Sequence, residues 1–111
     1  MRNTTTRPRY NNIENRDTIA SLQGGRPMLY AMRVKGGLIK IGCSRNIGER
    51  RRNLTGELLA MAPGDFADEL AIHQSLAGHA HHGREYYNPT PEVLAVVNEL
   101  REYFKLDPLA A

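Results

Sequence analysis

The sequence predicts a small α+β domain, an α/β sandwich in which a three-stranded antiparallel sheet is flanked by three to four helices. Short apolar stretches at residues 28–34, 38–42 and 57–62 favour strands, because each is bounded by glycine, proline or charged residues. Longer stretches with apolar residues three and four positions apart favour helices. The chain has 111 residues, 41% of them apolar, which suits one modest hydrophobic core.

The first two predicted strands form a hairpin. Lys35-Gly36-Gly37 joins them, and glycine adopts the positive φ angles of tight turns without steric cost. A three-residue loop pairs Tyr30 with Gly42. It also pairs Met32 with Lys40, whereas a two-residue loop would put Tyr30 and Lys40 on opposite faces. We expect the three-residue loop, which makes Tyr30 and Lys40 diagonal neighbours on one face.

A helix predicted from Ile47 carries three consecutive arginines. Arg50 lies three residues after Ile47 and four before Leu54, so it is expected to point along the apolar stripe. Arg51 and Arg52 are expected to turn outward. An inward arginine is costly unless it meets an anion, which is either an internal carboxylate or the phosphate of a ligand.

A second helix is predicted over residues 66–78, with Asp65 as its N-cap. Glu69 and His73 lie four residues apart and share a face, where they can bind a metal or move a proton. Taken alone, such a pair is more often a surface interaction. The residues expected towards the core are Phe66, Leu70, Ile72, His73, Leu76 and Ala77.

The rest of the chain is predicted to comprise an N-terminal arm, a surface loop, a short helix or turn and a final helix. Residues 1–26 are expected to form a flexible basic arm with a short helical turn over 15–22, and residues 27–111 the domain itself. A surface loop is expected over 79–82, and a short helix or turn over 84–89. A final helix that begins near Pro91, with Thr90 as its cap, is expected to pack on the core.

Positive charge is concentrated before residue 55. Residues 27–54 hold seven Lys or Arg and one Glu, whereas residues 55–111 hold three Lys or Arg and nine acidic residues. A basic half beside an acidic half favours a polyanionic partner, nucleic acid above all, although a solvated surface with segregated charges remains the alternative. Side chains expected to contact nucleic acid are Lys35, Arg45, Arg51, Arg52 and Arg84.

Membrane contact and secretion are not expected. No apolar run reaches the about 18–20 residues that cross a bilayer, and the N-terminus lacks the apolar centre of a signal peptide. The single cysteine, Cys43, has no partner for an internal disulfide. We therefore expect a cytoplasmic protein.

Taken together, these motifs resemble the GIY-YIG endonuclease superfamily over residues 27–88. Met28-Leu29-Tyr30 stands where the family has Gly-Ile-Tyr, and Lys40-Ile41-Gly42 where it has Tyr-Ile-Gly. Arg50 stands at the position of the active-site arginine. Glu69 stands at the position of the metal-binding glutamate.

The sequence is most similar to a small branch of that family, found in phage proteins and in a fungal meiotically up-regulated protein. The branch has Lys-Ile-Gly, then Arg-x-x-x-Leu, Glu-x-x-(apolar)-His and Gly-Glu-(aromatic)-(aromatic). The corresponding residues here are Lys40-Ile41-Gly42, Arg50 with Leu54, Glu69 with His73, and Gly83-Arg84-Glu85-Tyr86-Tyr87. Because Lys40 replaces a tyrosine near the family's reactive centre, the family mechanism is not transferred as a whole.

The resemblance implies a GIY-YIG-like fold and a metal-dependent DNA endonuclease or nickase of phage or mobile-element type, in a bacterial or phage-infected host cell. It implies one Mg²⁺ (or Mn²⁺) held by Glu69, with Arg50 on the scissile phosphate. Tyr30 is the expected base or water-orienting group and His73 its rival; Lys40 would hold phosphate or phenol. The alternative is a weakly active or inactive module of the same fold that binds DNA or a host protein.

Two further expectations follow. Tyr30 can act as a base only if Lys40 and Arg50 lower its pKa from about 10. All five side chains should converge in one concave patch. One such site cuts one strand, so double-strand cleavage would need a homodimer or two sequential nicks.

Overall fold

A five-stranded antiparallel sheet forms the centre of the fold in the computed structural model, which describes residue 13 and residues 16–83 and 85–110. The spatial order of the strands is β3-β1-β2-β5-β4. The strands are β1 Met28–Arg33, β2 Ile39–Ser44, β3 Glu57–Pro63, β4 Ala80–His82 and β5 Tyr86–Tyr87. The predicted α+β class is confirmed, but the sheet has five strands instead of three.

The hairpin between β1 and β2 has the predicted register. Tyr30 pairs with Gly42, and Met32 pairs with Lys40. The backbone N–H of Val34 donates to the carbonyl of Leu38 at 2.8 Å and closes the loop over residues 35–37. Gly36 and Gly37 take positive φ angles of 83° and 79°, which explains why glycine occupies the turn.

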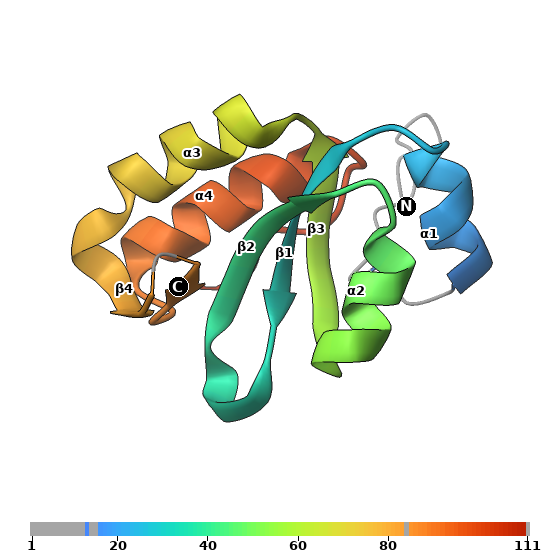
Figure 1. The fold of residues 1–111 in the computed structure, drawn as a ribbon. Helices are drawn as coiled ribbons and strands as arrows, with labels where there is room; N and C mark the ends of the chain where they lie inside the picture. Colours follow the sequence, from blue (N-terminus) through green and yellow to red (C-terminus); the bar gives the residue numbers. More distant parts are fainter. Residues whose placement is uncertain (1–12, 14–15, 84, 111) are drawn as a thin grey trace, which may run out of the picture.

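Four helices cover the sheet on both faces, and two cores result. The helices are α1 Arg16–Gln23, α2 Ile47–Leu54, α3 Phe66–Ser75 and α4 Pro91–Glu102. Figure 1 shows α1 and α2 on one side of the sheet and α3 and α4 on the other. Ile19 and Ile47 pack with Tyr30 and Met32 in the first core, whereas Val97 belongs to the second core.

A side chain caps the start of each of α2, α3 and α4, and Asp65 and Thr90 are the caps that the sequence predicts. The Asn46 side chain accepts from the backbone N–H of Glu49 at 3.1 Å at the start of α2. Asp65 and Asp68 form a capping box at the start of α3, in which each side chain accepts from the backbone N–H of the other residue. Thr90 accepts from the N–H of Val93 at 3.3 Å at the start of α4.

Two sequence predictions about the later segments are wrong. Residues 80–82 form β4 instead of a loop, and Tyr86–Tyr87 form β5 instead of a helix or turn. β5 adds to the edge of β2, where Lys40 pairs with Tyr86 and the N–H of Ile41 donates to the Glu85 carbonyl at 3.1 Å. Strands of two or three residues carry no periodicity that a sequence pattern can reveal.

The predicted core face of α3 is also wrong in part. Phe66 is 77% exposed and Leu70 is 51% exposed, and Ala77 is exposed as well. Only His73 and Leu76 are buried, with Ile72 packed against the second core. The helix therefore leaves its first two apolar side chains in solvent.

Part of the segment assigned to the N-terminal arm joins the domain. Residues 16–23 form α1, which covers the predicted helical turn except residue 15, a position outside the described residues, and Ile13 and Ile19 are 5% and 1% exposed. The buried Gln23 side chain donates to the Ser44 carbonyl at 2.7 Å and accepts from the N–H of Ile47 at 2.8 Å. These bonds attach α1 to the end of β2 and the start of α2.

Two of the expectations from sequence extend past the described part. Residues 1–12 of the predicted arm and the predicted nucleic-acid contact Arg84 lie outside the described residues.

Within the described residues, no helix combines the length and apolar character that crossing a bilayer requires.

Candidate active site

A cleft of about 680 Å³ is lined by residues of α2, α3, β1 and β2 and of the β5 segment. The five side chains predicted to act in catalysis all line it. They are Tyr30, Lys40, Arg50, Glu69 and His73. These five residues lie up to 43 positions apart in the chain.

Tyr30 forms part of the floor of the cleft and is only 2% exposed. Its ring lies over Gly42, where an added Cβ atom would stand 2.5 Å from the phenolic oxygen. Glycine at this position therefore makes room for the tyrosine. Burial raises the pKa of Tyr30, and the opposing charges of Lys40 and Arg50 do not offset it. The expected lowering of this pKa is wrong, because the sequence did not reveal how deeply the ring is buried.

Lys40 points into the same space and pairs with Glu85. The Lys40 Nζ atom lies 5.9 Å from the centre of the Tyr30 ring and 5.3 Å from that of Tyr86. The hydrogen bond from Lys40 lowers the pKa of Glu85, against the smaller opposing effect of burial. Sequence reasoning assigned no role to Glu85, although it stands in the motif Gly83-Arg84-Glu85-Tyr86-Tyr87.

Both nitrogens of His73 are engaged. Nε2 lies 3.0 Å from an oxygen of Glu69, and Nδ1 forms a hydrogen bond with the hydroxyl of Tyr87. Tyr87 is fully buried, and burial raises the pKa of its hydroxyl to about 12, so that it keeps its proton at neutral pH. Because a carboxylate only accepts, the network assigns the ring proton to Nε2, and Nδ1 accepts from Tyr87.

This arrangement bears on the choice between Tyr30 and His73 as base. A neutral His73 has one lone pair, on Nδ1, and Tyr87 occupies it. No nitrogen of His73 is left to take a proton from water in the cleft. His73 instead holds the carboxylate of Glu69 in place.

Arg50 is the free cation of the cleft. Its side chain is exposed and forms no hydrogen bond or ion pair in the structure as described. The predicted orientation along a buried stripe is therefore wrong: Arg51 is the more buried neighbour, and its buried Nε has no partner in the described structure. Arg52 is exposed, as predicted. An internal salt bridge does not account for Arg50.

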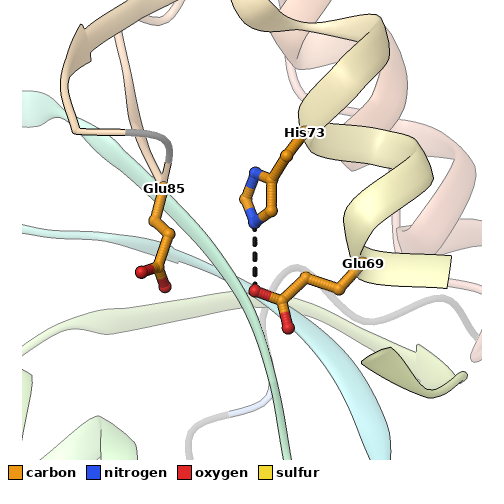
Figure 2. Close-up of side chains that lie close together, drawn as sticks. All are labelled: Glu69, His73 and Glu85. Atoms are coloured by element: carbon orange, nitrogen blue, oxygen red, sulfur yellow. Dashed lines mark hydrogen bonds and ion pairs between the residues drawn. The ribbon is translucent and has the colours of Figure 1, made fainter. Parts of the chain in front are cut away.

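Three groups in the cleft have the arrangement of a metal site. One donor atom each from Glu69, His73 and Glu85 lies within 4.8 Å of the other two. Figure 2 shows Glu69 and His73 on one helix, facing Glu85 across the cleft. Two carboxylate oxygens and an imidazole nitrogen suit a divalent cation, so the donor set fits the expected metal. Sequence reasoning found Glu69 as a ligand and did not assign Glu85.

The residues expected to contact nucleic acid are spread more widely. Lys35 is exposed in the hairpin loop, and Arg45 is exposed and donates to the carbonyl of Gly25 at 3.3 Å.

Comparisons with models of protein families, with curated proteins and with solved structures find no match. The chemistry of the cleft is therefore derived from its own residues.

Proposed function

We propose that this chain is a metal-dependent DNA endonuclease that nicks one strand and has a fold of the GIY-YIG type. One observation carries the proposal: Arg50, a cation without a partner in the described structure, lines the same cleft as the donor set of Glu69, His73 and Glu85. Hydrolysis of a phosphodiester uses both a cationic side chain and a metal ion, since the charge of the phosphate must be neutralised while one P–O bond forms and another breaks.

The charges of the cleft suit a phosphate together with a cation. Arg50 and Lys40 are positive, and Glu69 and Glu85 are negative. Arg50 would bind the scissile phosphate, because its planar guanidinium can donate two parallel hydrogen bonds to two phosphate oxygens. A divalent cation held by Glu69, His73 and Glu85 would neutralise charge on the phosphate and act as a Lewis acid.

The neighbours of the donor set support its ability to hold a cation. Tyr87 can donate to His73 or accept from it, so His73 can release Nε2 to a cation without losing its partner at Nδ1. A set that includes imidazole suits Mn²⁺ at least as well as Mg²⁺, which prefers oxygen ligands. The pairing of Lys40 with Glu85 opposes the binding of a cation, since the Lys40 ammonium competes for the Glu85 carboxylate.

Tyr30 would act as a hydrogen-bond donor. Its raised pKa keeps the phenol protonated at neutral pH, so phenolate is not the base in this proposal. The hydroxyl, which reaches the cleft over Gly42, is placed to donate to a phosphate oxygen or to orient a water molecule.

A second function is favoured by Lys40. Its ammonium already pairs with Glu85, in the position where the family has a tyrosine, and supplies a fixed positive charge near the phosphate site. A cleft with a permanent cation can bind a phosphate without cutting it. On this alternative the chain is a module that binds DNA, or a host protein, without cleavage.

Nicking of a supercoiled plasmid separates the two functions. The full chain is incubated with the plasmid in Mg²⁺, in Mn²⁺ and in EDTA. We expect nicking with either metal and none in EDTA. Arg50→Ala and Glu69→Gln should each lower the rate by about 10²–10³-fold, as does the loss of a group that stabilises a transition state.

Arg52→Ala is the matched control, since Arg52 is an exposed arginine of the same helix that does not line the cleft. It should weaken DNA binding slightly and reduce its salt dependence, with little effect on nicking at saturation. Salt-sensitive binding without nicking in either metal would reject the endonuclease in favour of the binding module. A chain that neither binds nor nicks DNA contradicts the endonuclease and the DNA-binding module alike.

A further inference from the structure

Two apolar side chains stand exposed at the rim of the cleft. Phe66 is 77% exposed and Leu70 is 51% exposed, and both line the cleft. They lie four residues apart on α3 and so share one face of the helix. Neither belongs to the two cores, so packing among the described residues of the domain does not account for them.

The opposite wall of the cleft is built differently. It is formed by α2, which contributes Arg50 and, one turn later, Leu54. Leu54 is partly buried and packs against the first core, whereas the Arg50 side chain has no partner in the described structure. The cleft therefore has an apolar, aromatic rim on one side and a free cation on the other.

We propose that Phe66 and Leu70 form a subsite for an unpaired nucleobase of the DNA strand whose phosphate Arg50 binds. This inference rests on the proposed function and deepens it by naming the substrate class. A nucleotide carries a flat π-surface one sugar away from its phosphate, which matches an exposed phenyl ring across a cleft from a guanidinium.

The state of the base decides which DNA fits. In a duplex, both faces of a base are covered by its neighbours in the stack, so Phe66 can reach one only after it is unstacked. Single-stranded or locally unpaired DNA has already lost that stacking. The subsite therefore favours single-stranded or locally unpaired DNA over intact duplex.

Charge complementarity favours a nucleotide over other occupants. A second copy of the chain, or an apolar peptide, would cover Phe66 and Leu70 but would leave Arg50 without an anion. A nucleotide satisfies both walls of the cleft at once.

The chain contains no tryptophan, which makes Phe66→Trp a single reporter at the subsite. The full-length variant is titrated with a single-stranded oligonucleotide, with the same strand made abasic, and with the duplex. Ca²⁺ replaces Mg²⁺ so that the strands are bound and not cut. We expect the fluorescence of the tryptophan to change strongly with the normal strand and weakly with the abasic strand and the duplex.

Affinity gives the second measurement. Phe66→Ala should weaken binding of the normal single strand by about tenfold or more, which is the usual effect of losing one aromatic stacking contact. It should have little effect on the abasic strand and the duplex. Tyr103→Ala is the matched control, because Tyr103 is also 51% exposed but does not line the cleft. It should change none of the three affinities.

Equal affinity of Phe66→Ala and the wild type for the normal single strand would overturn the subsite. If the wild type still binds and nicks DNA, the proposed function stands without it. A tryptophan signal that depends on protein concentration in the absence of DNA would assign the surface to a second copy and would also overturn the proposal. A wild type that binds no DNA would instead refute the proposed function itself.

Discussion

The ammonium of Lys40 pairs with the carboxylate of Glu85 across the β2–β5 strand pair. Lys40 is 8% exposed, whereas the side chain of Glu85 is 50% exposed. The pair therefore joins a nearly buried cation to a carboxylate that still faces the cleft. It ties the segment of the short strand β5 to the hairpin, and it occupies one of the three groups that can hold a metal.

Glu85→Gln should destabilise the domain at neutral pH and not in acid. Lys40 holds the pKa of Glu85 below its ordinary value of 4.5, so the folded protein binds fewer protons at this group than the unfolded chain. The pair therefore contributes stability above about pH 4.5, and the contribution is lost as the pH falls through the lower pKa of the folded state. Because solvent screens the half-exposed Glu85, we expect a loss of roughly 1 kcal/mol or less.

Urea unfolding of the wild type and Glu85→Gln at about pH 7 and about pH 3.5 measures this effect. Glu99→Gln is the control, since Glu99 is an exposed glutamate of α4 without an ion pair in the described structure. A difference between wild type and Glu85→Gln that persists unchanged in acid would show that charge pairing with Lys40 is not its cause.

Tyr30→Phe should slow nicking by about 10²-fold if the hydroxyl donates a hydrogen bond in the transition state. Burial raises the pKa of Tyr30 above 10, so the hydroxyl keeps its proton across the working range. The ratio of wild-type to variant rates should therefore stay constant from about pH 6 to about pH 9. A ratio that rises with pH would mean that phenolate acts as the base after all.

Tyr87→Phe should weaken metal binding while leaving DNA binding intact. The change keeps the ring that stacks on His73 at a centroid distance of 5.7 Å but removes the hydroxyl that bonds to Nδ1. Loss of such a supporting bond commonly costs about tenfold or more in metal affinity. The protein is titrated with Mn²⁺, and the nicking rate and the heat of binding are each measured. Both measurements should show the weaker affinity for Mn²⁺.

The unpaired Nδ1 in this variant should also cost about 1–2 kcal/mol in the free energy of unfolding. Tyr103→Phe, which alters an exposed tyrosine away from the cleft, should change neither quantity. If stability falls but the Mn²⁺ dependence of nicking does not move, Tyr87 has a purely structural role.

The features predicted correctly from sequence depend on neighbouring residues alone. Lys35-Gly36-Gly37 determines the loop, and through it the register that places Tyr30 beside Lys40 on one face. The helix starts after Asp65 and Thr90 follow from side chains that bond to backbone N–H groups two or three positions later.

Features that depend on distant groups could not be predicted from neighbouring residues. β4 and β5 exist because β2 offers an unpaired edge, and that edge brings Glu85 to Lys40. Arg101 interrupts the apolar stripe of α4, yet it is buried because the Leu59 carbonyl, from a distant strand, accepts from its guanidinium at 2.6 Å. Helical spacing placed Arg50 on an apolar stripe, whereas in the folded domain Arg50 is exposed and Arg51 is the more buried.

The sequence by itself determined the hairpin, its register, the helix caps and five residue types suited to phosphate chemistry. The tertiary structure decided that these five line one cleft, that Glu85 joins them, and that burial raises the pKa of Tyr30 instead of lowering it. The physical reason is the separation along the sequence over which each interaction acts. Turns and caps are set by bonds within a few residues, whereas burial and charge pairing depend on which distant segments come to lie against a side chain.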